Sequence, residues 1–282
     1  MNTKPGPSQH PDEDLSHALL AVENRCAAHP GFTAPRAGII LGSGLGGLAD
    51  EIASPLRIDY ADLPGFARAT ASGHRGQLIF GILDNVPVVA MAGRLHRYEG
   101  HSDDRVTFPV RLMAALGSTT LIVSNAAGGL NPVLDVGDIV VINDHIDLAR
   151  KGVRPICCPA PPGSTAGNCD LTPSLGRIAS PLRLYDNQLS QIALATARAG
   201  DFAAILGTYI ATLGPTYETR AEYRMMRKFG GDVVGMSTAP EVCVAATLGM
   251  RVLGLSMVSN VARPDQAQAT DHQDVLKAGR TA

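Results

Sequence analysis

Six short groups of polar residues follow apolar segments of this chain, and their side chains suit an anion and a polar ring. Arginine presents a planar fork to phosphate oxygens, and histidine adds further N–H donors. A carboxylate accepts the N–H groups of a heterocycle, while a carboxamide offers both a donor and an acceptor. These types together predict an anion site beside a heterocycle site. The groups are Gly42-Ser43, Gly93-Arg94-Leu95-His96, Asn125-Ala126, Glu218, Ser237-Thr238 and Asn260.

Residues 37–50, AGIILGSGLGGLAD, are predicted to form a buried strand that enters a glycine-rich loop and then a helix. The glycines let the backbone turn sharply and bring its N–H groups close to an anion. Ser43 adds one hydroxyl to this loop. The spacing Gly42-x-Gly44-x-x-Gly47 also fits the dinucleotide fingerprint, and a plain structural turn is a third interpretation.

A dinucleotide in this loop would make the chain an NAD-dependent oxidoreductase. Asp59, which follows Gly42 by 17 residues, would then bind the ribose. That hypothesis gives no role to the cationic groups around His74 and Arg94, nor to Glu218. It is therefore the minor alternative.

The histidines and cysteines do not have the spacing of a metal site. His74, His96 and His101 lack carboxylate partners at ligand spacing, and the five cysteines include no C-x-x-C pair. We therefore expect no metal, no cofactor, and the reduced thiols of a cytoplasmic protein.

A second local pattern, Thr238-x-x-Glu241 with Pro240 in the first turn, predicts a capping box at the start of a helix. Thr238 would then be structural. Ser237 would remain available to face an anion at that helix N-terminus.

The periodicity of the chain predicts one α/β domain. Residues 1–13 are predicted to be a disordered tail, residues 14–282 the domain, and residues 149–181 a long irregular loop. Strands are expected at 37–41, 55–60, 77–83, 86–92, 119–124, 138–143, 207–213, 232–236 and 252–259, with helices between several of them. Because ligands bind beyond the carboxyl ends of strands in such sheets, we expect the polar groups to converge.

Composition excludes two classes of partner. The net charge is −2, and no basic stripe with interleaved aromatic residues is present, which argues against nucleic acid. The polar N-terminal segment has no apolar core of a signal peptide, and no apolar run reaches the roughly 20 residues that span a bilayer. The sequence thus predicts a cytoplasmic protein with small-molecule partners and no membrane association.

Several longer motifs resemble the purine nucleoside phosphorylases of the trimeric class. They are LGSGLGGL (41–48), SGHRGQL (72–78), GRLHRYEGH (93–101), SNAAGGLNPVLDVGDIVVINDHI (124–146), GPTYETRAEYR (214–224), GDVVGMSTAPEV (231–242) and SN (259–260). The resemblance implies a single-domain fold with a mixed, twisted β-sheet flanked by helices, assembled as a homotrimer.

The resemblance also implies a role for each matched residue. A phosphate site is implied at Ser43, His74, Arg94, His96, Ala126 (through its backbone N–H) and Ser237. The implied purine and ribose site comprises Tyr98, Tyr217, Glu218, Val234, Gly235, Met236, Asn260 and His272. His96, Glu218 and Asn260 are the implied catalytic residues.

The implied reaction is phosphorolysis of a purine nucleoside to a free base and ribose 1-phosphate, with inorganic phosphate as co-substrate and no cofactor. Glu218 can accept the N1–H of a 6-oxopurine, so we expect inosine and guanosine to be preferred over adenosine. A methylthioadenosine phosphorylase and a non-catalytic nucleoside-binding protein are the remaining alternatives. The first lacks the Glu218–Asn260 pair, and the second is suggested by the altered 149–181 segment.

The chain departs from the family pattern at two places. The segment before Tyr185-Asp186 does not preserve the region that carries an intersubunit phenylalanine, and Val261 replaces a basic residue often found after the asparagine. The first departure bears on the trimer contact.

Overall fold

The computed structural model describes residues 11–29, 32–43, 45–67, 75–149 and 184–262. The residue ranges of its α-helices are Pro11–Ala27 (α1), Asp103–Ala115 (α2), Asn187–Ala199 (α3), Arg220–Lys228 (α4) and Ala239–Thr247 (α5). Its strands are Ala37–Leu41 (β1), Ala53–Asp59 (β2), Gln77–Leu83 (β3), Val86–Ala92 (β4), Thr120–Gly129 (β5), Ile139–Asp147 (β6), Ala204–Ala211 (β7), Val233–Gly235 (β8) and Arg251–Val261 (β9).

The described strands form one mixed sheet in the order β2-β3-β4-β1-β5-β8-β7-β6-β9. Strands β4, β1, β5 and β9 run parallel, while β2, β3 and β8 pair antiparallel with their neighbours β3, β4 and β5. Strand β9 pairs with both β6 and β5, which closes β5-β8-β7-β6-β9 into a ring. The α/β class and the mixed sheet flanked by helices are confirmed.

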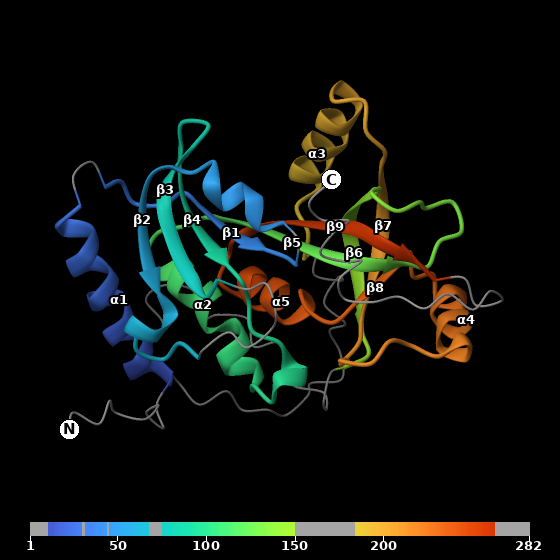
Figure 1. Ribbon diagram of the computed structural model, residues 1–282, viewed down its shortest axis with the longest axis horizontal. Coiled ribbons are helices and arrows are strands. Elements are labelled where there is room, and N and C mark those ends of the chain that lie inside the picture. The colour runs from blue at the N-terminus through green and yellow to red at the C-terminus, as the bar shows by residue number, and fades with distance from the viewer. Residues whose placement is uncertain (1–10, 30–31, 44, 68–74, 150–183, 263–282) are drawn as a thin grey trace, which may run out of the picture.

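Helices cover the sheet on separate sides (Figure 1). Helix α2 contacts both α1 and α5, and these three helices contribute Val22, Leu112 and Val242 to the main core beside Ile40 of β1. Helix α3 packs on β6 and β7 through Leu194 in a separate cluster. None of the helices within the described ranges is long and apolar enough to cross a membrane.

Several predicted boundaries match the structure. Strands β3 and β4 occupy 77–83 and 86–92 as expected, and Asp84 and Asn85 turn the hairpin with φ of 45° and 64°. Two consecutive residues at positive φ match the twist of paired strands, and Asn and Asp tolerate that region. The local sequence is therefore sufficient to specify this hairpin.

Other boundaries differ from the predictions. Strands β5 and β9 continue to Gly129 and Val261, past the expected ends at 124 and 259, because the two strands pair in parallel along their whole length. Asn125 and Asn260 are therefore strand residues. The glycine loop leads only into a short 3-10 turn, Gly46–Asp50, and not into an α-helix. Helix α1 begins at Pro11, three residues before the predicted start of the domain at residue 14.

Asp186 joins α3 to the edge of the ring. Its Oδ1 accepts the Leu189 N–H at 2.9 Å as the N-cap of α3, and its carboxylate pairs with Arg251 of β9 at 2.6 Å. Its backbone N–H donates to the Val252 carbonyl at 2.8 Å. The Arg251 hydrogen bond is the main reason that the pKa of Asp186 falls to about 2.

Replacement of this cap tests how much it contributes to stability. Asp186→Ala removes the cap and the ion pair, and we expect it to lower the free energy of unfolding by about 1–2 kcal/mol in urea titrations. Asp186→Asn keeps a capping oxygen, and we expect its loss of unfolding free energy to be less than half that of Asp186→Ala. Equal losses for both variants would show that the cap contributes little.

Candidate active site

A pocket of about 400 Å³ lies where β1, β4, β5, β8 and β9 meet. All six polar groups singled out in the sequence contribute to its wall. Every predicted site residue in the described ranges lines this pocket, namely Ser43, Arg94, His96, Tyr98, Ala126, Tyr217, Glu218, Val234, Gly235, Met236, Ser237 and Asn260. The predicted residues His74 and His272 lie outside the described residues.

The end of β1 approaches β5 so closely that only glycine fits at position 42. A Cβ on Gly42 would lie 2.6 Å from the Asn125 Cα and 2.7 Å from the Ser124 carbonyl oxygen. The Gly42 N–H donates to the Ser124 hydroxyl at 3.2 Å. This contact directs the chain into the pocket, where Ser43 lines the wall.

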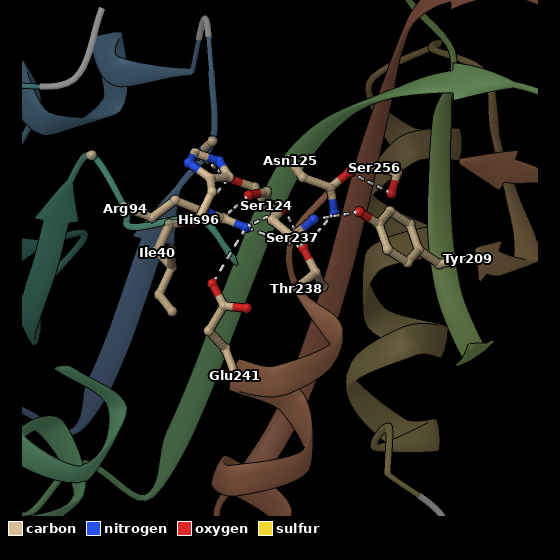
Figure 2. Close-up of polar contacts among 12 residues, drawn as sticks. Ile40, Arg94, His96, Ser124, Asn125, Tyr209, Ser237, Thr238, Glu241 and Ser256 are labelled. Atoms are coloured by element: carbon tan, nitrogen blue, oxygen red, sulfur yellow. Dashed lines mark hydrogen bonds and ion pairs between the residues drawn. The ribbon is translucent and has the colours of Figure 1, made fainter. Parts of the chain in front are cut away.

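Arg94 connects β4, β5 and α5 at the base of the pocket (Figure 2). Its side chain is only 2% exposed. Nη1 donates to the Ser237 hydroxyl at 2.8 Å and the Thr238 hydroxyl at 3.1 Å, and Nη2 donates to the Ser124 carbonyl. Nη1 also lies 3.6 Å from Glu241 Oε1, a carboxylate that is equally buried. The guanidinium therefore orders the hydroxyls around it as well as supplying positive charge.

The predicted capping box at Thr238 is wrong. Thr238 has a φ of 74° and its side chain makes no cap, because its hydroxyl accepts from Arg94 and from Asn125 Nδ2 at 2.9 Å. Glu241, the other expected member, faces Arg94. Asn125 in turn accepts from the Ser256 hydroxyl at 2.8 Å. A buried polar network across three elements has replaced the local cap.

His96 is 8% exposed and stacks on Tyr98, with ring centroids 4.7 Å apart. Its Nδ1 lies 2.9 Å from Glu99 Oε1, which also accepts the His96 backbone N–H at 2.8 Å. Burial, and then the charge of Arg94, lower the pKa of His96 to about 4. The ring is therefore neutral at pH 7, with the Nδ1 proton directed at Glu99.

The opposite end of the pocket carries the groups suited to a heterocycle. Glu218 Oε1 accepts from the Thr212 hydroxyl at 2.9 Å, and that hydroxyl also lies 3.3 Å from the Gly235 carbonyl. Asn260, on β9, accepts the Ser259 hydroxyl at 3.0 Å through Oδ1. Its Nδ2 amide is thereby established as the donor side of the carboxamide.

Four residues around the pocket were not predicted as site residues. Glu99 and Thr212 bond to His96 and Glu218, Glu241 pairs with Arg94, and Tyr223 lines the wall beside Glu218. The spacing of Glu99, three residues after His96, was a usable signal. Glu241 was noticed only as a cap, and nothing in the sequence marked Thr212.

The topology excludes the dinucleotide alternative. In a dinucleotide-binding fold the strand that ends in the ribose-binding acid lies next to the strand that enters the glycine loop. Here β2, which ends at Asp59, is separated from β1 by β3 and β4, and the Asp59 carboxylate accepts from Gln77 at 2.7 Å. The 3-10 turn after the glycine loop also lacks the helix N-terminus that would face a pyrophosphate.

The parts of the chain that the structure describes contain no cluster of three or more His, Cys, Asp or Glu side chains able to hold a metal ion. The pocket walls instead carry an arginine, an imidazole, hydroxyls and amides. Such groups bind an oxyanion and a heterocycle through hydrogen bonds.

Comparison with known proteins shows the family of the chain. Residues 36–282 match the sequence model of the phosphorylase superfamily. Purine nucleoside phosphorylase 1 of Bacillus subtilis is 46% identical over 243 residues, which are 86% of this chain and 85% of that protein. The rat purine nucleoside phosphorylase is 42% identical over 260 residues, covering 88% and 84% of the two chains.

A solved structure shares the fold as well. Schistosoma mansoni purine nucleoside phosphorylase in complex with inosine superposes with a TM-score of 0.78 at 36% identity, covering 95% of this chain and 91% of that one. The chain therefore belongs to the purine nucleoside phosphorylase family within the phosphorylase superfamily.

The lowered pKa of His96 predicts acid sensitivity. Its unfolded pKa is 6.5 and its folded pKa about 4, so the folded state favours the neutral ring. That contribution is complete above pH 6.5 and is lost as the pH falls through 4, a change of roughly 3 kcal/mol. We expect His96→Gln to remove this part of the pH dependence of the unfolding free energy, measured by urea titration from pH 7 to 4.

His17→Gln, on an exposed position of α1, controls for the loss of an imidazole elsewhere. The assignment is contradicted if the wild type and His96→Gln lose stability in parallel over this pH range.

Proposed function

We propose that this protein catalyses the phosphorolysis of purine ribonucleosides and deoxyribonucleosides, with a preference for inosine and guanosine. The observation that carries the proposal is one pocket with an anion end at Ser43, Arg94 and Ser237 and a heterocycle end at Glu218 and Asn260. The products are the free purine and (deoxy)ribose 1-phosphate, which places the enzyme in purine salvage. Inorganic phosphate is a co-substrate, and the reaction uses no cofactor.

The anion end suits a phosphate dianion. Arg94 supplies positive charge, and Ser43, Ala126 and Ser237 line the same pocket, where two hydroxyls and a backbone N–H would act as further donors. The neutral His96 is held by Glu99, and a bound dianion favours protonation of its Nε2. In the proposed reaction Nε2 thus exchanges a proton with phosphate.

The chemistry follows from charge development. As the N-glycosidic bond breaks, the ribosyl carbon becomes oxocarbenium-like, and phosphate both stabilises that charge and attacks it. The bonding electrons pass to the purine ring. Asn260 Nδ2, kept as a donor by the Ser259 hydroxyl on Oδ1, is positioned to donate to N7 as negative charge develops there.

Base selection rests on Glu218. Its carboxylate accepts the N1–H of a 6-oxopurine, whereas adenine presents a lone pair at N1 and leaves the carboxylate unpaired. Such a mismatch can lower kcat/KM for adenosine by up to roughly 10⁴-fold relative to the 6-oxopurine nucleosides. The presence of both Glu218 and Asn260 in the pocket supports this enzyme over a methylthioadenosine phosphorylase.

A phosphate-dependent assay on inosine, guanosine, xanthosine and adenosine tests the proposal. We expect base release from inosine and guanosine only when phosphate is present, and much less from adenosine. Inosine binding without release of hypoxanthine would support a nucleoside-binding protein instead. Comparable turnover of adenosine and inosine would contradict the role of Glu218.

Asn260→Ala addresses the leaving group in the same assay. Loss of a donor to developing charge costs about 10²–10³ in kcat. Asn187→Ala, at the exposed start of α3, is the matched control and should retain wild-type turnover. If Asn260→Ala keeps full activity on inosine, the leaving-group assignment fails.

We also propose that the enzyme is a cytoplasmic homotrimer, with purine nucleosides and phosphate as its small-molecule partners. The resemblance of the sequence motifs to the trimeric class supports this assembly. Sedimentation equilibrium should give a mass three times that of the chain. A monomer at micromolar concentration would contradict this proposal.

A further inference from the structure

A buried carboxylate lies behind the anion end of the pocket. Glu241 Oε1 is 3.6 Å from Arg94 Nη1, and both side chains are 2% exposed. Arg94 belongs to the described wall of the pocket, whereas Glu241 does not. In Figure 2 the carboxylate reaches from α5 toward the guanidinium. A ligand in the pocket therefore meets Arg94 directly and Glu241 only through its charge.

Hydrogen bonds satisfy this carboxylate poorly. Its distance of 3.6 Å to Nη1 is longer than a hydrogen bond, and Nη1 donates instead to the hydroxyls of Ser237 and Thr238. Within the described residues, Glu241 Oε2 has no hydrogen-bond partner. Burial raises the pKa of Glu241, and the charge of Arg94 opposes that rise. Such a carboxylate costs stability, which favours a role in the neighbouring site over a role in packing.

The charge of Glu241 offsets the charge of Arg94. Among the described residues that line the pocket, Arg94 is the one fully charged cation, because the lowered pKa of His96 leaves its ring neutral. Charges this close interact strongly when both are withdrawn from water. The ion pair as a whole carries no net charge. A phosphate dianion beside it meets hydroxyl and N–H donors, with little excess positive charge.

Phosphate has to be a nucleophile as well as a ligand in the proposed reaction. An uncompensated guanidinium would bind the free dianion tightly and draw charge away from its attacking oxygen. In the transition state the positive ribosyl carbon cancels part of the phosphate charge, so the guanidinium would stabilise that state less than the ground state. A reduced positive charge therefore weakens phosphate binding and lowers the barrier to its attack.

We propose that Glu241 is a positioning residue that acts through Arg94, whose charge it offsets so that phosphate binds more weakly and reacts faster. This inference rests on the proposed function, because it concerns the phosphate of that reaction. Glu241 neither touches the phosphate nor exchanges a proton with it.

Glu241→Gln removes the charge and keeps the length of the side chain. Calorimetric titration with inorganic phosphate, without nucleoside, should give a Kd about tenfold lower than that of the wild type, because a buried like charge has been removed. In a single turnover of inosine at saturating phosphate, base release should slow by about twofold or more. A packing defect does not produce tighter binding together with slower chemistry.

Three further variants separate charge from packing. Glu241→Met removes the charge with a flexible side chain and should lower the phosphate Kd as Glu241→Gln does. Glu241→Asp shortens the side chain but keeps the charge, so its Kd should stay within about threefold of the wild type. Glu23→Gln, at an exposed position of α1, is the matched control for the loss of a glutamate charge and should leave both measurements unchanged.

Urea titrations with and without phosphate extend the test to variants of low stability. Loss of the Glu241 charge leaves Arg94 uncompensated in a buried site, which destabilises the folded state. Bound phosphate restores a partner, so it should raise the unfolding free energy of Glu241→Gln by more than that of the wild type. If neither Glu241→Gln nor Glu241→Met folds even in phosphate, the pair is structural and the inference is overturned.

The phosphate titration also separates this inference from the proposed function. If the wild type binds phosphate but releases no base from nucleosides, the proposed function fails, and the comparison of Kd values still tests the effect of Glu241 on phosphate binding. An unchanged or higher Kd in Glu241→Gln, or an equal gain in stability from phosphate in both proteins, overturns the inference.

Discussion

The buried pair of Arg94 and Glu241 is the interaction on which the anion end of the pocket depends. Both side chains are 2% exposed; Arg94 follows β4, and Glu241 lies in α5. A buried ion pair is stable only where further hydrogen bonds satisfy its remaining donors. Two of the three Arg94 nitrogens, Nη1 and Nη2, donate to Ser124, Ser237 and Thr238. The positions of the Ser237 and Thr238 hydroxyls are therefore tied to the same guanidinium.

This network also explains an unfavourable backbone conformation. Thr238 has a φ of 74°, which a β-branched residue rarely adopts. Its hydroxyl accepts from both Arg94 and Asn125 Nδ2, and these bonds hold the residue there. The conformation turns the chain so that Ser237 faces the pocket immediately before α5 begins. Local strain is thus retained where it places a functional side chain.

The heterocycle end is positioned by different means. The pairing of β9 with β5 brings Asn260 across from Gly128, so the amide enters the pocket from a continuous strand. Glu218 instead lies outside regular structure, one residue before the cap of α4, and its carboxylate accepts from the Thr212 hydroxyl. A long strand thus holds Asn260, and the start of a capped helix holds Glu218.

Two copies of one sequence pattern show what the sequence by itself determined and what it did not. Thr219-x-x-Glu222 and Thr238-x-x-Glu241 both have the capping-box spacing, but only the first forms the box. Glu222 faces solvent, where no other partner competes for it. Glu241 is buried beside Arg94, a residue 147 positions earlier whose proximity no local pattern encodes.

The same distinction holds for the fold and the site. Local patterns determined the β3–β4 hairpin, most strand positions and the residue types at the strand ends, because turn chemistry and alternation act over a few residues. Tertiary structure alone decided that β5 and β9 extend to Gly129 and Val261, that Glu241 meets Arg94, and that Asn125 meets Thr238. Each of these depends on burial and on contacts between segments far apart in the chain, which no short stretch of sequence can specify.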